Sequence, residues 1–165
     1  MERIGRVPVV AGQESVWDYP RPPRVERTSK LIEVFAGGRR IATSSAAYRV
    51  LETSHPPVYY IPLRDIDAAV LRAADRHTFC EFKGTASYYD VVIDGATIAN
   101  AGWYYPTPSP GFEPIADHVA FYPARVERCL VDGEEVRPQA GGFYGGWITG
   151  DIVGPFKGEP GSAGW

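Results

Sequence analysis

Three short turn signals, at residues 37–38, 94–95 and 132–133, constrain the fold of this sequence more than any other feature. They read Gly-Gly, Asp-Gly and Asp-Gly, and each lies between short runs rich in strand-forming residues. Such pairs tolerate the positive φ angles that a tight β-hairpin turn requires. Glycine and proline contribute 18 and 15 of the 165 residues, which favours many turns and short elements over long helices. We therefore expect a mainly β protein.

The stretch from residue 62 to residue 76 is the one segment whose pattern predicts a helix. Asp65 can cap its first turn, and Asp67 suits the positive end of the helix dipole. An apolar stripe would let this helix cover a sheet, and it consists of Ile66, Ala69 and Val70. Together with the hairpins, this predicts a bent sheet or half-barrel of about eight strands with one short helix.

The whole chain, residues 1–165, is expected to form a single β domain. An extended arm should occupy about residues 1–29, and a glycine-rich tail that wraps over the body should occupy about residues 139–165. Trp17 and Tyr19 lie two residues apart in the arm, so on an extended chain they share a face and can anchor it to the body.

Charge is unevenly distributed along the chain. Residues 1–49 carry nine basic and five acidic residues, a net of +4, and residues 50–165 carry eight and fifteen, a net of −7. We expect the basic arm to lie against the acidic body. The overall net charge of −3 argues against a nucleic-acid partner.

The remaining composition predicts a reduced, cytoplasmic protein. The apolar runs are short, so no membrane association is expected. Cys80 and Cys129 lie far apart and form no CxxC motif, so we interpret both as free thiols and expect neither a metal nor another cofactor.

The stretch LETSHPPVYYIP, residues 51–62, is the first part of a candidate site. Pro56 and Pro57 stiffen the chain just before an aromatic strand. We expect Glu52 and His55 to project from this corner towards a neighbouring sheet face. A carboxylate there would favour the charged imidazole, so the pKa of His55 should be raised.

The segment 78–93 supplies the second part. If Gly84 forms a β-bulge, one face is apolar, and it carries Cys80, Phe82, Tyr89, Val91 and Ile93. The other face is polar, and it carries Glu81, Lys83, Tyr88 and Asp90. An exposed sheet face with a cross-strand ion pair explains the same pattern equally well.

These two parts define the candidate residues. The candidates for acid–base catalysis are Glu52, His55, Glu81 and Lys83. The candidates for ligand binding are Tyr60, Cys80, Tyr88, Asp90 and Trp103.

Two functional classes remain open. The domain either binds a small polar metabolite, with or without transforming it, or it is a non-catalytic module that binds protein or a second copy of itself as a homo-oligomer. An enclosed pocket around the candidate residues favours the first class, and a flat solvated face favours the second.

The sequence also resembles a known family. It contains, in this order, the strings ESVWDYPRPP, VLETSHPPVYYIP, CEFKGTASYYD and HVAFYP. These strings resemble the family called domain of unknown function 427 over roughly residues 14–158. The resemblance implies a compact β domain, similar in topology to the β-tent domains of methionine sulfoxide reductase B and some zinc-binding exchange factors. It implies no activity.

Two properties are not carried over from that resemblance. Tent relatives often bind zinc through two CxxC pairs, and this sequence has neither. The family is sometimes labelled nucleotidyltransferase-like, and Asp65-Ile66-Asp67 gives a D-x-D. No Gly-Ser turn precedes it, so we do not expect nucleotidyl transfer.

Overall fold

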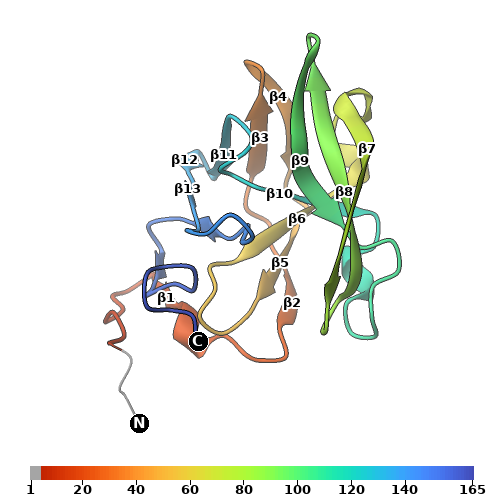
Figure 1. Cartoon of the computed structure of the whole chain (residues 1–165). Coiled ribbons are helices and arrows are strands. Elements are labelled where there is room, and N and C mark those ends of the chain that lie inside the picture. Colours follow the sequence, from red (N-terminus) through yellow and green to blue (C-terminus); the bar gives the residue numbers. More distant parts are fainter. Residues whose placement is uncertain (1–4) are drawn as a thin grey trace.

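The computed structural model describes residues 5–165, so the first four residues of the expected arm lie outside the described residues (Figure 1). Within this range the chain is mainly β, as predicted, and its strands form four sheets. The largest sheet has the order β2 (Arg24–Arg27), β5 (Tyr48–Leu51), β6 (Val58–Pro62), β10 (His118–Phe121), β9 (Ala96–Tyr104), β8 (Gly84–Ile93) and β7 (Leu71–Cys80). A four-stranded sheet has the order β12 (Glu134–Glu135), β11 (Arg128–Val131), β3 (Ile32–Ala36) and β4 (Arg39–Ser44).

Two small sheets involve the chain ends. In one, β1 (Glu14–Ser15) pairs in parallel with β15 (Ile152–Val153), and in the other, β13 (Arg137–Pro138) pairs with β14 (Trp147–Ile148). Counting these short pairs, the described residues form fifteen strands rather than the eight expected. The large sheet is open, because its edge strands β2 and β7 do not pair with each other in the described chain.

The predicted hairpin turns are confirmed. Residues 37–38 join β3 to β4, residues 94–95 join β8 to β9, and residues 132–133 join β11 to β12. Both residues of every turn have positive φ angles, between 48° and 82°. This is the backbone geometry that the Gly-Gly and Asp-Gly pairs were expected to supply.

The helix expected over residues 62–76 is wrong. The segment makes two 3₁₀ turns, η2 (Leu63–Asp65) and η3 (Ala68–Val70), and then enters β7, which pairs along β8. Asp67 does cap a turn, but only the short η3, through a 3.1 Å bond from the backbone N–H of Ala69 to its carboxylate. A short isolated helix is marginal in water, so the long β7–β8 ladder determines the conformation.

The other two helical turns are η1 (Val16–Asp18) and η4 (Glu113–Ile115). In the described part of the chain, none of the helical turns has the length and apolarity that crossing a membrane requires.

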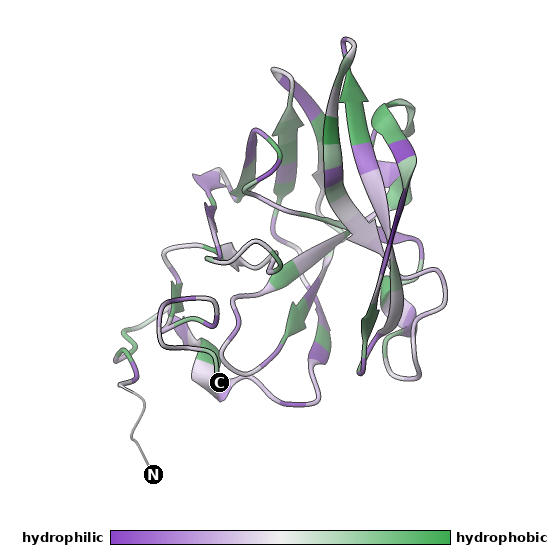
Figure 2. Cartoon of the chain, in the orientation of Figure 1, coloured by the Kyte–Doolittle hydropathy of each residue, from purple (hydrophilic) through white to green (hydrophobic). Residues whose placement is uncertain are grey.

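The large sheet carries a buried apolar cluster on each face, and hydrophobic bands alternate with polar ones along its strands (Figure 2). On β6, Tyr59 and Ile61 point into the main core between the two large sheets, and Tyr60 points to the opposite face. On β10, Val119 and Ala120 divide in the same way. Because side chains alternate along a strand, one sheet supplies two apolar surfaces.

The arm lies against the tail, where β1 pairs with β15 (Figure 1). A third apolar cluster joins them, and it consists of Val16, Tyr19, Leu51, Ile148, Ile152 and Phe156. The Trp17 indole N–H also donates to the Pro155 carbonyl at 2.9 Å. The expected anchoring of the arm by its aromatic residues is therefore present in the structure.

A buried arginine fixes the arm to the sheet. Arg49 on β5 is 6% exposed and binds Glu14 at 2.8 Å and Glu26 at 3.0 Å. Glu14 accepts a further bond from the Tyr19 hydroxyl at 2.9 Å. The bond to Arg49 outweighs burial and lowers the pKa of Glu14. This network holds β1 and β2 against β5.

We expect Arg49→Met to lower the free energy of unfolding at neutral pH by roughly 2 kcal/mol. This is less than the loss for a fully buried pair, because both glutamates are 39% exposed. Urea denaturation measures the effect. Since the stabilisation needs ionised Glu14, the difference should shrink as the pH falls below the unfolded-state pKa of 4.5. Arg24→Met, at the exposed Arg24–Glu26 pair, is the matched control and should change stability by less than about 0.5 kcal/mol. Equal effects of the two substitutions would contradict the anchoring role.

Candidate functional site

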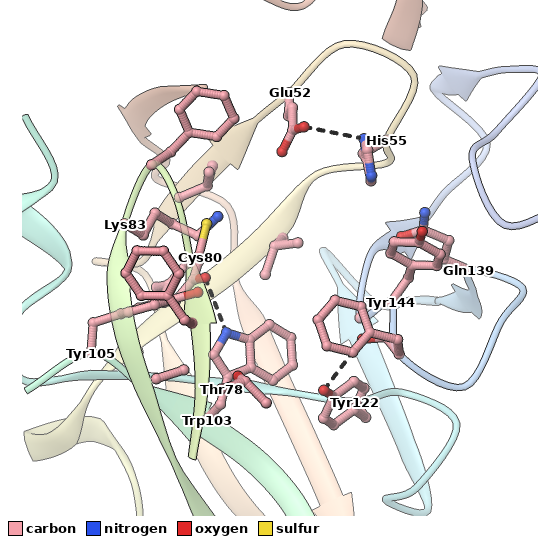
Figure 3. Close-up of a pocket in the computed structure, with 18 of the residues that line it drawn as sticks. Glu52, His55, Thr78, Cys80, Lys83, Trp103, Tyr105, Tyr122, Gln139 and Tyr144 are labelled. Atoms are coloured by element: carbon pink, nitrogen blue, oxygen red, sulfur yellow. Dashed lines mark hydrogen bonds and ion pairs between the residues drawn. The ribbon is translucent and has the colours of Figure 1, made fainter. Parts of the chain in front are cut away.

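A cavity of about 290 Å³ opens on the face of the large sheet that points away from the four-stranded sheet. Its walls come from the sheet, the turn between β7 and β8, the loop between β5 and β6, and the tail. Figure 3 shows Lys83, Cys80 and Tyr105 on one side and Tyr144 and Gln139 on the other. Segments distant in sequence therefore enclose one space.

The floor of the cavity is aromatic because of strand alternation. Tyr60 on β6 and Trp103 on β9 both point to this face, and the Trp103 indole N–H donates to the Tyr60 hydroxyl at 3.2 Å. Trp103 also packs on Tyr122, with ring centroids 4.5 Å apart. These rings hold one another in place, so the floor is preorganised.

The hydroxyl groups of the cavity differ in acidity. Burial raises the pKa of Tyr60, Tyr105 and Tyr122. Burial acts in the same sense on Tyr88, but bonds with Thr78 and Tyr122 and the charge of Arg76 outweigh it, so the pKa of Tyr88 is lowered. The Thr78 and Tyr88 hydroxyl groups are 2.9 Å apart.

Glu52 and His55 lie together at the mouth, as expected from the proline corner (Figure 3). The carboxylate beside His55 is Glu52, with Nδ1 and Oε2 3.9 Å apart, rather than Glu81. Nδ1 is 3.0 Å from the Thr53 carbonyl, so in the neutral ring it carries the proton and donates it there. Glu52 itself pairs with Arg21 at 3.3 Å.

The expected rise in the pKa of His55 is wrong. Burial lowers the pKa, and the Thr53 carbonyl and the Glu52 charge compensate only in part. The positive charges of Arg21 and Lys83 lower it further. His55 is therefore neutral at pH 7, and Nε2 is left as an acceptor.

The turn between β7 and β8 supplies the second group of candidates. Residues 81–83 form this turn, and Gly84 begins β8 with a φ of 104° instead of forming a bulge within one continuous strand. As a result, Cys80 and Phe82 pack on the same face as Tyr88, and not with Val91 as the bulge predicted.

The two charged residues of this turn differ in their surroundings. Lys83 is half-buried, and its ammonium group lies 5.8 Å from the centroid of the Tyr105 ring. Glu81 is exposed to solvent although it also lines the cavity. Of the two charged side chains in this turn, Lys83 is therefore the less solvated.

The tail forms the remaining wall. Arg125 donates to the Gly142 carbonyl at 2.9 Å, and the Tyr122 hydroxyl donates to the Phe143 carbonyl at 3.3 Å. Gly145 packs directly on Trp103, since a Cβ atom there would lie 2.2 Å from the indole ring.

Eight of the nine candidate residues line the cavity, and Asp90 does not. A register shift between Tyr89 and Val91 redirects Asp90, which accepts a 2.8 Å bond from the Asn100 backbone and pairs with Arg72 at 3.4 Å. Its expected role in ligand binding is not supported by this position.

Some lining residues were not among the candidates, namely Thr78, Tyr105, Tyr122, Gln139 and Tyr144. Tyr105 could have been found, because it lies two residues after Trp103 and so shares its face. Gln139 and Tyr144 belong to a tail without regular alternation, so the neighbouring sequence does not predict that they line the cavity.

The nucleotidyltransferase-like motif lies elsewhere. Neither Asp65 nor Asp67 lines the cavity. Asp65 accepts a bond from the Ser44 hydroxyl at 2.6 Å, and Asp67 pairs with Arg39 at 3.1 Å. Both carboxylates therefore have local structural partners. Among residues 5–165, no group of three or more His, Cys, Asp or Glu side chains is placed to hold a metal ion.

A family model described as a domain of unknown function (DUF427) matches residues 24–132. The chain belongs to the DUF427 family. The sequence matches no curated protein. The region matched by the DUF427 model includes β2 to β11, and with them the sheet floor, the β5–β6 corner and the β7–β8 turn. The tail wall of this DUF427 domain lies beyond the matched residues.

We expect His55 to titrate with a midpoint below 6.5, because burial disfavours its charged form. Two-dimensional NMR of the imidazole, with His55→Asn to assign the signal, measures this. Because the folded-state pKa of His55 is lower than its unfolded-state pKa, folding disfavours protonation of this residue. The protein is therefore more stable at pH values above the unfolded-state pKa, and this advantage is lost as the pH falls. The wild type should therefore lose stability relative to His55→Asn on acidification below 6.5. A midpoint above that value would show that Glu52 outweighs burial.

We expect Gly145→Ala to destabilise the protein by about 1–3 kcal/mol, because the added methyl group overlaps the Trp103 ring. Thermal and urea unfolding measure the effect. Gly142→Ala is the matched control in the same loop, since nothing lies within 4 Å of the added atom, and it should stay within about 0.5 kcal/mol of the wild type. If the two variants are equally stable, the tail does not form the wall described.

Proposed function

We propose that this DUF427 domain binds a small molecule that has a flat, unsaturated body and polar substituents. The observation that carries the proposal is the cavity itself, which is walled by Tyr60, Tyr88, Trp103 and Tyr105. A partly open aromatic pocket, rather than a flat solvated face, supports the binding class over the interaction class.

The size of the cavity limits the ligand. A volume of about 290 Å³ lies just below the usual range for ligand pockets, roughly 300–1,000 Å³. It suits one ring or two fused rings, and a dinucleotide cofactor is too large. Buried aromatic rings form the floor of the cavity, so a flat ring fits against it.

The mouth supplies groups for polar substituents and for acid–base steps. His55 offers a neutral Nε2, Lys83 offers a cation, and Glu52 and Glu81 offer carboxylates. These four residues remain the candidates for any transformation of the bound molecule. The cytoplasmic location and the lack of a metal, cofactor or nucleic-acid partner stay predictions from the sequence.

A screen of small planar compounds by ligand-observed NMR and thermal shift tests the proposal, because a specific ligand must raise the apparent stability. Ala86 lines the cavity and is 2% exposed, so Ala86→Leu should fill the space and weaken binding about tenfold or more. If the leucine variant folds poorly, Ala86→Val adds a smaller side chain and takes its place in the test. Thr85→Leu, at the exposed neighbouring position on β8, is the control and should bind normally. No hits, or hits that are insensitive to both substitutions at Ala86, would overturn the proposal.

One observation supports the alternative of an interaction module. Phe79 and Phe143 line the mouth and are 76% and 59% exposed. A second copy of the chain could cover these rings. Light scattering would then show a concentration-dependent dimer that the double substitution Phe79→Ser and Phe143→Ser abolishes, and a monomer at all concentrations would exclude self-association.

A further inference from the structure

Protein cations cover three tyrosines of the cavity wall. The pairs are Arg76 with Tyr88 at 5.1 Å, Lys83 with Tyr105 at 5.8 Å, and Arg125 with Tyr122 at 4.0 Å, each from the cationic group to the ring centroid. Among residues 5–165, none of these three cations forms an ion pair with a carboxylate. Their charge is therefore left uncompensated beside the cavity.

The acidic residues of the cavity do not cancel this charge. Glu52 is paired with Arg21 at 3.3 Å, so its charge is balanced locally. Glu81 is exposed on the β7–β8 turn and Arg76 is exposed on β7, so water and salt screen both of these opposite charges. Lys83 is half-buried against Tyr105, so its charge acts through a less polar surrounding.

The cations also act on the pKa values of neighbouring groups. The charge of Lys83 contributes to the lowered pKa of His55, and the charge of Arg76 contributes to the lowered pKa of Tyr88. These two groups lie at the mouth and the floor of the same cavity. The charge of Lys83 therefore reaches His55, where the nearby Glu52 carboxylate acts in the opposite sense, and the charge of Arg76 reaches Tyr88.

We propose that the ligand of this cavity is a planar carboxylic acid, with its ring between the tyrosines and its carboxylate directed towards Lys83. The inference rests on the proposed function and adds the charge class of the ligand. A ligand cation would meet like charges at tyrosine faces that the protein's own cations already cover. Lys83 is the one lysine or arginine among the described lining residues, so a single negative charge is matched. A phosphate dianion would need more donors.

A matched panel of probes tests the sign and size of this charge preference. Phenyl, indolyl and naphthyl rings would each be used as the acetate, the acetamide and the ethylammonium compound, with dissociation constants from NMR titration at low ionic strength. For each ring that binds, we expect the acetate to bind about fivefold or more tightly than the acetamide, and the ammonium compound to bind most weakly.

Substitution of Lys83 tests whether this residue causes the preference for the acetate. Lys83→Met keeps the aliphatic stem and removes the charge, so the advantage of the acetate should fall by about fivefold while acetamide binding changes by less than about twofold. Lys83→Gln is the second variant. Arg64→Met removes one exposed charge that does not line the cavity, and it should leave the preference unchanged.

The outcomes separate the two proposals. If the rings bind but the acetates have no advantage, or if neither Lys83 variant reduces it, the acid proposal is wrong and the binding function stands. If no member of the panel binds in any form, both proposals are overturned.

Discussion

The need to cover both faces of the large sheet determines most of this structure. Alternation along β6 and β10 places apolar side chains on each face, and neither face can be left in water. The four-stranded sheet packs on one face and forms the main core with it. The other face is covered by turns, by the η4 segment and by the tail, which have no regular surface to match the sheet. The cavity is the space that these irregular segments leave above the aromatic floor.

The tail keeps its place because Trp147 is fully buried. Its indole N–H donates to the Phe121 carbonyl at 3.1 Å, and its backbone N–H donates to the Pro57 carbonyl at 2.8 Å. The second bond ties the tail to the proline corner that carries Glu52 and His55. The tail wall of the cavity, which lies beyond the residues matched by the DUF427 model, is therefore bonded directly to the β5–β6 wall, which lies within them.

Local signals were enough to predict part of this architecture. The hairpin turns depend on two residues each, so the sequence pattern at 37–38, 94–95 and 132–133 was sufficient. The helix over residues 62–76 was wrong because the ladder with β8, a partner beyond the segment, decides its conformation. Asp90 was misplaced for a related reason, since a register shift is a property of two strands together. Eight candidates converge because their strands are neighbours in the sheet or end at its mouth, whereas the tail residues arrive through long-range packing.

The neutral state of His55 at the mouth of the cavity follows from the burial of its ring, which outweighs its pairing with Glu52. A carboxylate 3.9 Å from an imidazole would ordinarily raise its pKa, yet the loss of water around His55 has the larger effect. Glu52 is also engaged by Arg21, which reduces what it can offer to the ring. The corner therefore presents a neutral acceptor at pH 7, and Lys83, on the opposite side of the mouth, presents a full charge. This separation lets one group accept a hydrogen bond or proton while the other holds a negative charge, an arrangement that a pair of mutually neutralised residues could not provide.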